Sequence, residues 1–349
     1  MSIFALALTT RGAWFLPLGN FPESSSSSVE RMSSDGRFIV GSEEENAYSW
    51  DLGDRLNGEL PTTLRVASLK GFQKELLEIS RDGKVIFGRI KRAAYFKIPS
   101  TIAFKLENFP ETNESYVLSS CYSGNHLVGA SGSKACLWHF SQVDQQYRIK
   151  PLELTKLITE EILGSVASGI TSDGKLITGW VYTSSATIGF QWTKENGAEN
   201  IGHLEGGERT FPFAVSADGT TIVGKSNKKA FRRKKAERGF LNRLLNWTPE
   251  YVMEDLGSLN KETPSVAYAV SADGSAAVGK SGEDAFLWTE TSGMQKLQNV
   301  LTRHLNLRRN LQGWRLSVAY TISNDGLYIG GKGVNPYGKS QAFVAYLGR

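Results

Sequence analysis

Short apolar runs alternate with turn signals along the whole chain, and one pattern of hydrophobic and polar positions recurs seven times. Each copy has a β-prone run, an Asp-Gly or related turn, and a second apolar run ending in a glycine five residues after the first. The turn glycines are Gly36, Gly83, Gly124, Gly174, Gly219, Gly274 and Gly326. Because Asp-Gly favours the positive φ angles of a tight turn, each copy predicts a β-hairpin. The steps of 41 to 55 residues between copies indicate a repeat protein.

An aromatic-rich phrase follows each hairpin and predicts a third strand. The seven phrases are AYSW at 47–50, AYFK at 94–97, ACLW at 135–138, GFQW at 189–192, LLNW at 244–247, AFLW at 285–288 and AFVA at 342–345. In four copies the phrase ends nine residues after the second glycine, as from Gly41 to Trp50. A weaker fourth strand follows, as at 251–259 and 293–297. Four short antiparallel strands per repeat predict an all-β fold, a seven-bladed β-propeller.

The two ends of the chain supply complementary parts of one blade. The last repeat ends after its third strand at 342–347, and the segment GAWFLPLG at 12–19 has the pattern of a fourth strand. We therefore expect residues 1–349 to form a single propeller domain whose N-terminal strand completes the last blade, which leaves no open sheet edge. The alternative is an eight-bladed ring in which residues 2–8 add a further strand.

The last three repeats resemble a known family. The phrases VSADGSAAVGKSGEDAFLWTETSGMQKL at 270–297 and LQGWRLSVAYTISNDGLYIGGKGVNPYGKSQAFVAYL at 311–347 are similar to the HAF-repeat family of bacterial repeat proteins. The resemblance covers nearly the whole chain and is weakest at 79–129, where Ser123 replaces the turn aspartate and Lys97 the tryptophan. It implies a repeat architecture and an extracytoplasmic role, and it supplies no catalytic motif.

The composition leaves the compartment open. No apolar run approaches the roughly 18 residues of a membrane-spanning helix. The apolar run at 3–8 has no basic residue before it, so we expect no cleaved signal peptide. The compartment is therefore unknown, and the chain is either cytoplasmic or exported by a signal-independent route.

Most of the recurring polar and aromatic residues have a structural interpretation. We interpret the turn aspartates as hydrogen-bonding residues of Asx-type turns rather than as calcium ligands. The tryptophans of the third strands predict packing between blades, whereas Trp180 and Trp314 lie outside that register. Cys121 and Cys136 fall on alternate strands of one blade, too far apart for a disulfide. Four scattered histidines show no zinc-ligand spacing, so we predict no metal, no cofactor and no identifiable catalytic residue.

A basic segment is the largest departure from the repeat. The predicted insertion 225–243 precedes the third-strand phrase at 244–247 and has a net charge of +8, which leaves −3 for the remainder of a chain of net charge +5. An insertion between the second and third strands lies on the propeller face opposite the Asp-Gly turns. The loop before Trp192, the loop 332–341 and the apolar-striped links 154–163 and 297–305 share that face. The predicted partner-binding residues are Lys228, Lys229, Arg232, Arg233, Lys234, Lys235, Arg238, Arg243, Arg303, Arg308 and Arg309.

Three functions remain open at this level. The first is a non-enzymatic, monomeric propeller that binds an acidic protein surface through the face with the insertions, since function is commonly carried by loops on a rigid scaffold. The second is binding of a polyanion, either nucleic acid or an anionic membrane, through residues 225–243. The third is a carbohydrate-active propeller enzyme with a pair of acids near the central channel.

Overall fold

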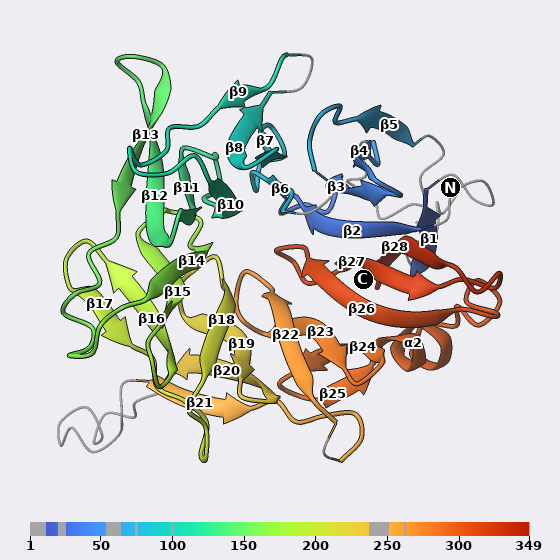
Figure 1. The fold of residues 1–349 in the computed structure, drawn as a ribbon. Coiled ribbons are helices and arrows are strands. Elements are labelled where there is room, and N and C mark those ends of the chain that lie inside the picture. Colours follow the sequence, from blue (N-terminus) through green and yellow to red (C-terminus); the bar gives the residue numbers. More distant parts are fainter. Residues whose placement is uncertain are drawn as a thin grey trace, which may run out of the picture.

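The chain forms a ring of seven four-stranded antiparallel sheets around a central channel (Figure 1). The computed structural model describes residues 12–19, 26–53, 64–73, 76–98, 101–236, 251–261 and 263–348. The predicted seven-bladed propeller is therefore confirmed, and the eight-bladed alternative is wrong. Its extra strand would have used residues 2–8, which lie outside the described residues.

The strands of each blade are given from the channel outward. Blade 1 contains β2 (Ser27–Met32), β3 (Phe38–Glu43), β4 (Asn46–Asp51) and β5 (Arg65–Ser68). Blade 2 contains β6 (Glu78–Ile79), β7 (Ile86–Ile90), β8 (Ala93–Lys97) and β9 (Phe104–Lys105). Blade 3 contains β10 (Ser115–Ser120), β11 (His126–Ser131), β12 (Lys134–Ser141) and β13 (Gln146–Pro151). Blade 4 contains β14 (Gly164–Ile170), β15 (Leu176–Tyr182), β16 (Thr187–Thr193) and β17 (Gly197–Asn200).

The remaining three blades complete the ring. Blade 5 contains β18 (Thr210–Val215), β19 (Thr221–Ser226), β20 (Lys229–Lys235) and β21 (Tyr251–Asp255). Blade 6 contains β22 (Ser265–Val270), β23 (Ala276–Ser281), β24 (Asp284–Thr289) and β25 (Gly293–Lys296). Blade 7 contains β26 (Arg315–Ile322), β27 (Tyr328–Val334), β28 (Ser340–Tyr346) and β1 (Trp14–Leu18).

The N-terminal strand closes the ring as the sequence predicts. Strand β1 pairs antiparallel with β28, with Trp14 opposite Tyr346 and Leu18 opposite Ala342 (Figure 1). Both faces of this blade are packed, because Phe15 joins the core between blades 6 and 7 while Trp14 and Leu18 join the core between blades 7 and 1. Closure thus ties the two ends of the chain into one sheet.

The recurring turn is held by the residues that make it recognisable. In blade 1 the Ser33 hydroxyl donates to Asp35 at 2.6 Å, the backbone N–H of Phe38 donates back to Ser33 Oγ at 2.9 Å, and Gly36 has φ +75°. The same Ser or Thr to Asp hydrogen bond occurs in blades 2, 4, 5, 6 and 7. The structural interpretation of the turn aspartates is confirmed. In blade 3, Cys121 and Ser123 take these places, and the N–H of His126 donates to Cys121 Sγ at 3.3 Å.

The second glycine of the repeat accommodates a β-bulge in the innermost strand. In blade 6 the register between β22 and β23 shifts between Ala267 and Ala269, so Tyr268 is the extra residue. A Cβ atom on Gly279, opposite Ala267, would lie 1.9 Å from the carbonyl oxygen of Val266. Blades 1, 3, 4, 5 and 7 have the bulge at the same place, and a Cβ there would meet a backbone oxygen at 1.9–2.1 Å. Glycine is therefore required by a close backbone approach.

In the sequence, the two apolar-striped links between blades both match one face of a helix, and the structure forms a helical turn in one of them. Residues 297–305 form a short α2 (Leu297–Asn299) and one π-helical turn (Val300–His304). Leu297, Val300 and Leu301 are the buried residues of this segment. Residues 154–163 are wrong as a helix: they form turns, with Leu154 buried and the neighbouring apolar residues packed on the core between blades 3 and 4. The apolar residues of 154–163 therefore pack on the core without forming helical hydrogen bonds.

The structure also corrects the third strand of blade 5. Strand β20 spans Lys229–Lys235, so AFRR at 230–233, not LLNW at 244–247, pairs with β19. Arg233 thus follows Gly224 by the usual nine residues and occupies the tryptophan position, where it is 8% exposed. Its guanidinium lies 3.8 Å from the Tyr251 ring centre and donates to Gln191 at 2.9 Å. A long aliphatic stem lets arginine fill an interblade site that tryptophan fills elsewhere.

As a result, the inserted residues lie between the third and fourth strands of blade 5. The end of β20 and the start of β21 lie on the face with the Asp-Gly turns, which we call the turn face. We call the opposite face the loop face. Arg238, Arg243 and the LLNW phrase fall in 237–250, outside the described residues.

Candidate functional site

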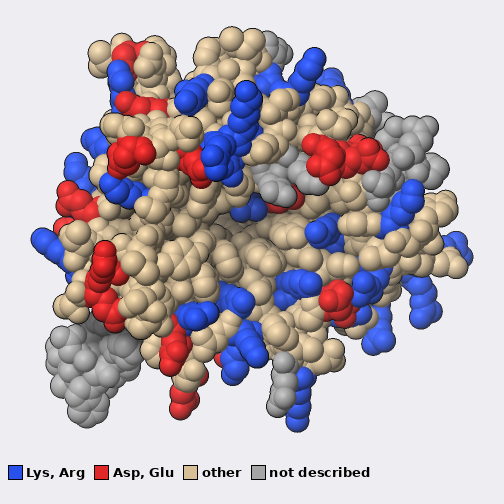
Figure 2. All heavy atoms as spheres, viewed as in Figure 1, with Lys and Arg blue, Asp and Glu red and all other residues tan. Residues whose placement is uncertain are grey.

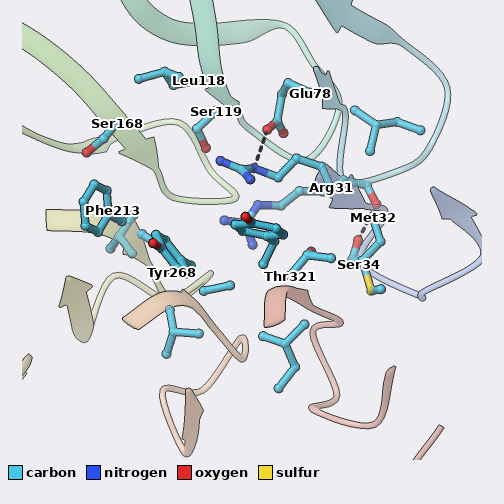
Figure 3. A pocket seen from close by; sticks show the side chains of 18 of the residues that line it. Arg31, Met32, Ser34, Glu78, Leu118, Ser119, Ser168, Phe213, Tyr268 and Thr321 are labelled. Carbon is cyan, nitrogen blue, oxygen red and sulfur yellow. Dashed lines mark hydrogen bonds and ion pairs between the residues drawn. The ribbon is translucent and has the colours of Figure 1, made fainter. Parts of the chain in front are cut away.

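The innermost strands place their bulged residues around the central channel. These residues are Glu30, Leu118, Ser168, Phe213, Tyr268 and Tyr320, which come from blades 1, 3, 4, 5, 6 and 7. All of these residues except Glu30 line a cavity of about 80 Å³ in the channel, together with Arg31, Glu78 and Arg81 (Figure 3). In these six blades the bulge therefore determines which side chain faces the channel.

One side of the channel is a continuous series of aromatic rings. Ring centres are 5.8 Å apart between Trp180 and Phe213, 5.7 Å between Phe213 and Tyr268, and 5.4 Å between Tyr268 and Tyr320. The series crosses blades 4 to 7. Burial raises the pKa of both Tyr268 and Tyr320, so both phenols stay protonated at neutral pH. This wall offers apolar ring faces with two hydroxyl groups.

The opposite side is charged (Figure 3). Arg31 of blade 1 donates through Nε to Glu78 of blade 2 at 3.1 Å, and Ser120 of blade 3 donates to the other carboxylate oxygen at 3.4 Å. Glu78 is 6% exposed, and its burial raises the pKa of the carboxyl group to about 7 against the opposing effects of Arg31 and Arg81. The ionised and protonated forms of Glu78 are therefore similarly populated near neutral pH.

A second set of cations lies one strand out from the channel wall, towards the loop face. The residue that follows the second glycine is basic in blades 2, 5, 6 and 7; we call these residues, Arg89, Lys225, Lys280 and Lys332, the mouth cations. Lys225, Lys280 and Lys332 stand opposite Phe211, Val266 and Val318 of the innermost strands. The Lys332 ammonium lies 5.7 Å from the ring centre of Tyr320, which ties this position to the channel.

The mouth cations have no ion-pair partner among the residues that the structure describes. No carboxylate of the described chain lies within 4 Å of any of them, and the Nε of Arg89 is buried without a hydrogen-bond acceptor. In blade 4 the equivalent residue is Trp180, whose indole N–H is also buried without an acceptor. Figure 2 shows basic side chains around a hollow at the centre of the face in view.

By contrast, the predicted binding residues on β20 are occupied by contacts within the protein. Lys229 pairs with Asp255 at 2.8 Å, Arg232 with Glu254 at 2.6 Å, and Lys234 with Glu290 at 2.6 Å. Arg232 also lies 4.3 Å above the Trp288 ring and is 3% exposed. Lys228 and Lys235 are exposed at the two ends of the strand. Partner binding by this segment stays a prediction.

The other predicted cations lie on the loop face. Arg303, Arg308 and Arg309 are exposed on the connection between β25 and β26, and none has an ion-pair partner in the described chain. They share this face with the mouth cations. The aligned repeats contain the signal for the mouth cations, a basic residue after the second glycine, but this signal is spread over four blades and not concentrated in one run.

The remaining predictions for tryptophan and cysteine are largely confirmed. Trp50, Trp138 and Trp288 are buried between blades, and Trp314 is packed against Phe15. Trp192 is partly buried against the core between blades 3 and 4. Cys121 and Cys136 are free and buried. Among the described residues there is no group of three His, Cys, Asp or Glu side chains that could hold a metal ion. No helix in the described chain has the length and apolar character to cross a membrane.

Comparison with known proteins shows the fold and no more. No protein-family model and no curated protein sequence matches the chain. The solved β-propeller domain of Cps50 (Swd1) from Myceliophteria thermophila is similar over 95% of this chain and 98% of its own, with 10% identity and a TM-score of 0.58. An oligogalacturonate lyase in complex with manganese is similar over 96% of both chains, with 12% identity and a TM-score of 0.55. A putative TolB from Agrobacterium tumefaciens covers 81% of this chain and 94% of its own, with 16% identity and a TM-score of 0.47. The chain therefore shares the propeller fold of the Cps50 domain, and its resemblance to the HAF-repeat family stays a prediction.

Proposed function

We propose that this chain is a non-enzymatic propeller scaffold that binds an acidic segment of a protein partner on its loop face. The observation that supports the proposal is the set of mouth cations without carboxylate partners. A cation with no neighbouring carboxylate attracts anionic groups of a partner, and a ring of such cations favours and orients the encounter.

The surrounding surface suits a protein segment better than a phosphate backbone. Aromatic rings lie beside the mouth cations, as Tyr320 does beside Lys332, so side chains of a peptide can pack where its carboxylates pair. The exposed Arg303, Arg308 and Arg309 extend the same positive region outward along one connection. In the dense basic run, which favoured a polyanion in the sequence, Lys229, Arg232 and Lys234 are paired with carboxylates.

Among the described residues, the lining of the cavity has one carboxylate rather than the acid pair that the carbohydrate alternative requires. Among the described residues that line the 80 Å³ cavity, Glu78 is the one carboxylate, and Arg31 holds it in an ion pair. Glycoside hydrolysis uses two carboxylates about 5–10 Å apart. A protein-binding role does not require that pair, so it accounts for the channel more simply.

Fluorescence anisotropy with a labelled peptide of alternating Glu and Phe residues tests this proposal. We expect the K225Q/K280Q/K332Q variant to bind at least tenfold more weakly than wild type. The matched control is K84Q/K175Q/K194Q, which removes the same charge from exposed positions on the turn face. Equal loss in both variants, or tighter binding of a 20-base-pair DNA duplex than of the peptide, would overturn the proposal. The monomeric state is a separate prediction that sedimentation checks.

A further inference from the structure

The Arg81 side chain crosses the central channel at its turn-face end. Its guanidinium donates to Asn324 Oδ1 of blade 7 and to the backbone oxygen of Ile170 in blade 4, both at 3.4 Å. Both contacts are long, and both acceptors are neutral. No carboxylate of the described chain forms an ion pair with Arg81, because Glu78 is engaged by Arg31.

The Arg81 guanidinium is partly buried, and its two long hydrogen bonds to neutral acceptors replace only part of its hydration. Burial lowers the pKa of Arg81, while Glu78 acts in the opposite direction from a distance. Removing a cation from water is unfavourable unless charged or well-formed hydrogen bonds replace the hydration. A carboxylate compensates best for the lost hydration of an arginine, because it can accept two parallel hydrogen bonds from the planar guanidinium.

The turns around Arg81 form a closed ring of interblade backbone hydrogen bonds, with N–O distances of 2.8–3.3 Å. The donors and acceptors run from Ser34 to Arg81, Asp82 to Tyr122, Tyr122 to Ser172, Ser172 to Ala217, Asp218 to Ala272, Ala272 to Asn324, and Asn324 back to Ser34. The ring fixes the turns around the axis, and Arg81 spans the opening that they enclose. Access to the cavity is therefore from the loop face.

The cavity above Arg81 is small and has two unlike walls. Its volume of about 80 Å³ has room for a carboxylate group and part of a ring, but not for a polymer that passes through the channel. Phe213, Tyr268 and Tyr320 line it opposite the charged wall (Figure 3). Their successive ring centres, 5.7 and 5.4 Å apart, form a surface against which a flat ring packs.

We propose that the channel floor binds a small carboxylate ligand, with its acid group on Arg81 and a flat ring against Phe213, Tyr268 and Tyr320. The ligand reaches this site from the loop face, and the site is independent of the acidic protein segment proposed above. Arg31 contributes by holding Glu78 in an ion pair, which leaves the Arg81 guanidinium available to the carboxylate of the ligand.

Isothermal titration calorimetry with benzoate tests the site. We expect benzoate to bind at least tenfold more tightly than acetate, which lacks the ring, and than benzamide, which lacks the charge. The R81Q variant should lose at least tenfold in benzoate affinity. K84Q is the matched control, because Lys84 is three residues away and its side chain is 79% exposed.

Several results would overturn this site. They are equal binding of acetate or benzamide, tighter binding of glucuronate than of benzoate, or an unchanged affinity in R81Q. If R81Q does not fold, E78Q decides the question, since loss of the competing carboxylate should raise benzoate affinity several-fold, and an unchanged or lower affinity contradicts the proposal. Failure of the acidic-peptide experiment leaves these expectations intact, since the mouth cations are not part of this site.

Discussion

Lys229, Arg232 and Lys234 on β20 are 2.6–2.8 Å from carboxylates of Asp255, Glu254 and Glu290. Lys225, which is four residues before Lys229 on the preceding strand, has no such partner in the described chain, and the same is true of Lys280. These three cations of the dense run are paired with carboxylates of the adjacent strand β21 and of the next blade. The scattered lysines lie at one repeated position where the facing residues are apolar. Charge density along a sequence is therefore a poor guide to free charge on a fold.

The largest effect should come from Gly279, which faces the β-bulge at Tyr268 on the neighbouring strand and directly precedes the mouth cation Lys280. A Cβ at this position meets the Val266 carbonyl at 1.9 Å, so we expect G279A to lower the free energy of unfolding by more than about 3 kcal/mol. Denaturant unfolding followed by circular dichroism measures this. In G164A the nearest heavy atom would be at 3.6 Å, and that variant should be nearly neutral. Similar losses in both would contradict the bulge as the reason for the second glycine.

The next prediction contrasts Glu78 in the channel with Glu290 beside β20 as the pH changes. The folded pKa of Glu78, about 7, lies above its ordinary value of 4.5, so the native state binds the extra proton between these pH values. Stability from this group therefore falls as pH rises from 4.5 to 7, by on the order of 3 kcal/mol. The groups that act on Glu78 are Arg31 from β2, Ser120 from blade 3 and Arg81 from its own turn.

Unfolding of E78Q across pH 4 to 8 checks this sign. The variant should lose the decline between pH 4.5 and 7. Glu290 has the opposite sign, since hydrogen bonds from Lys234 and Arg232 lower its pKa from 4.5 to about 2. The stability that ionised Glu290 contributes is present above pH 4.5 and is lost as pH falls towards 2. E290Q should therefore lower the free energy of unfolding only above that range. A decline with rising pH that persists in E78Q would show that another group is responsible.

The comparison between paired and unpaired cations predicts a difference in stability. Arg232 is 3% exposed, pairs with Glu254 and Glu290, and packs on Trp288, so R232A should lower the free energy of unfolding by about 2 kcal/mol. K280A removes a cation with no ion pair and should change stability by less than about 0.5 kcal/mol. Thermal or chemical unfolding of the two variants side by side measures the difference. Equal losses would mean that the mouth cations are structural.

The smallest expected effect is on salt dependence. Raising NaCl from 50 to 300 mM should weaken binding of the acidic peptide several-fold, because the mouth cations face a partly solvated region. The K225Q/K280Q/K332Q variant should show a shallower dependence than wild type, while K229Q, which removes a paired cation, should retain the wild-type slope. Anisotropy titrations at several salt concentrations give these slopes, and a steep slope that persists in the triple variant would rule out these lysines as the contact.

Much of the scaffold could be predicted because its signals are local. The Asp-Gly turn requires a left-handed glycine, as at Gly36 with φ +75°, and the nine-residue spacing to the third strand follows from a hairpin of constant length. Blade 5 broke the expectation because Arg233 stands where four other blades have tryptophan, and a Trp further along the chain matched the pattern better. Spacing was the more reliable signal there, since hairpin geometry constrains length more strongly than residue type.

The amino-acid sequence by itself determined the repeat, the turn chemistry, the number of blades and the closure by residues 12–19, because each depends on contacts within one hairpin or between neighbouring strands. Only the tertiary structure decided which charges remain available. Arg232 meets Glu290 across 58 residues and Arg81 meets Asn324 across 243, and these pairings exist only when the blades close into a ring. The channel, with rings on one side and Arg31, Glu78 and Arg81 on the other, is formed by one residue or a few from each blade. No single repeat contains it, since the wall is complete only after the seventh sheet is in place.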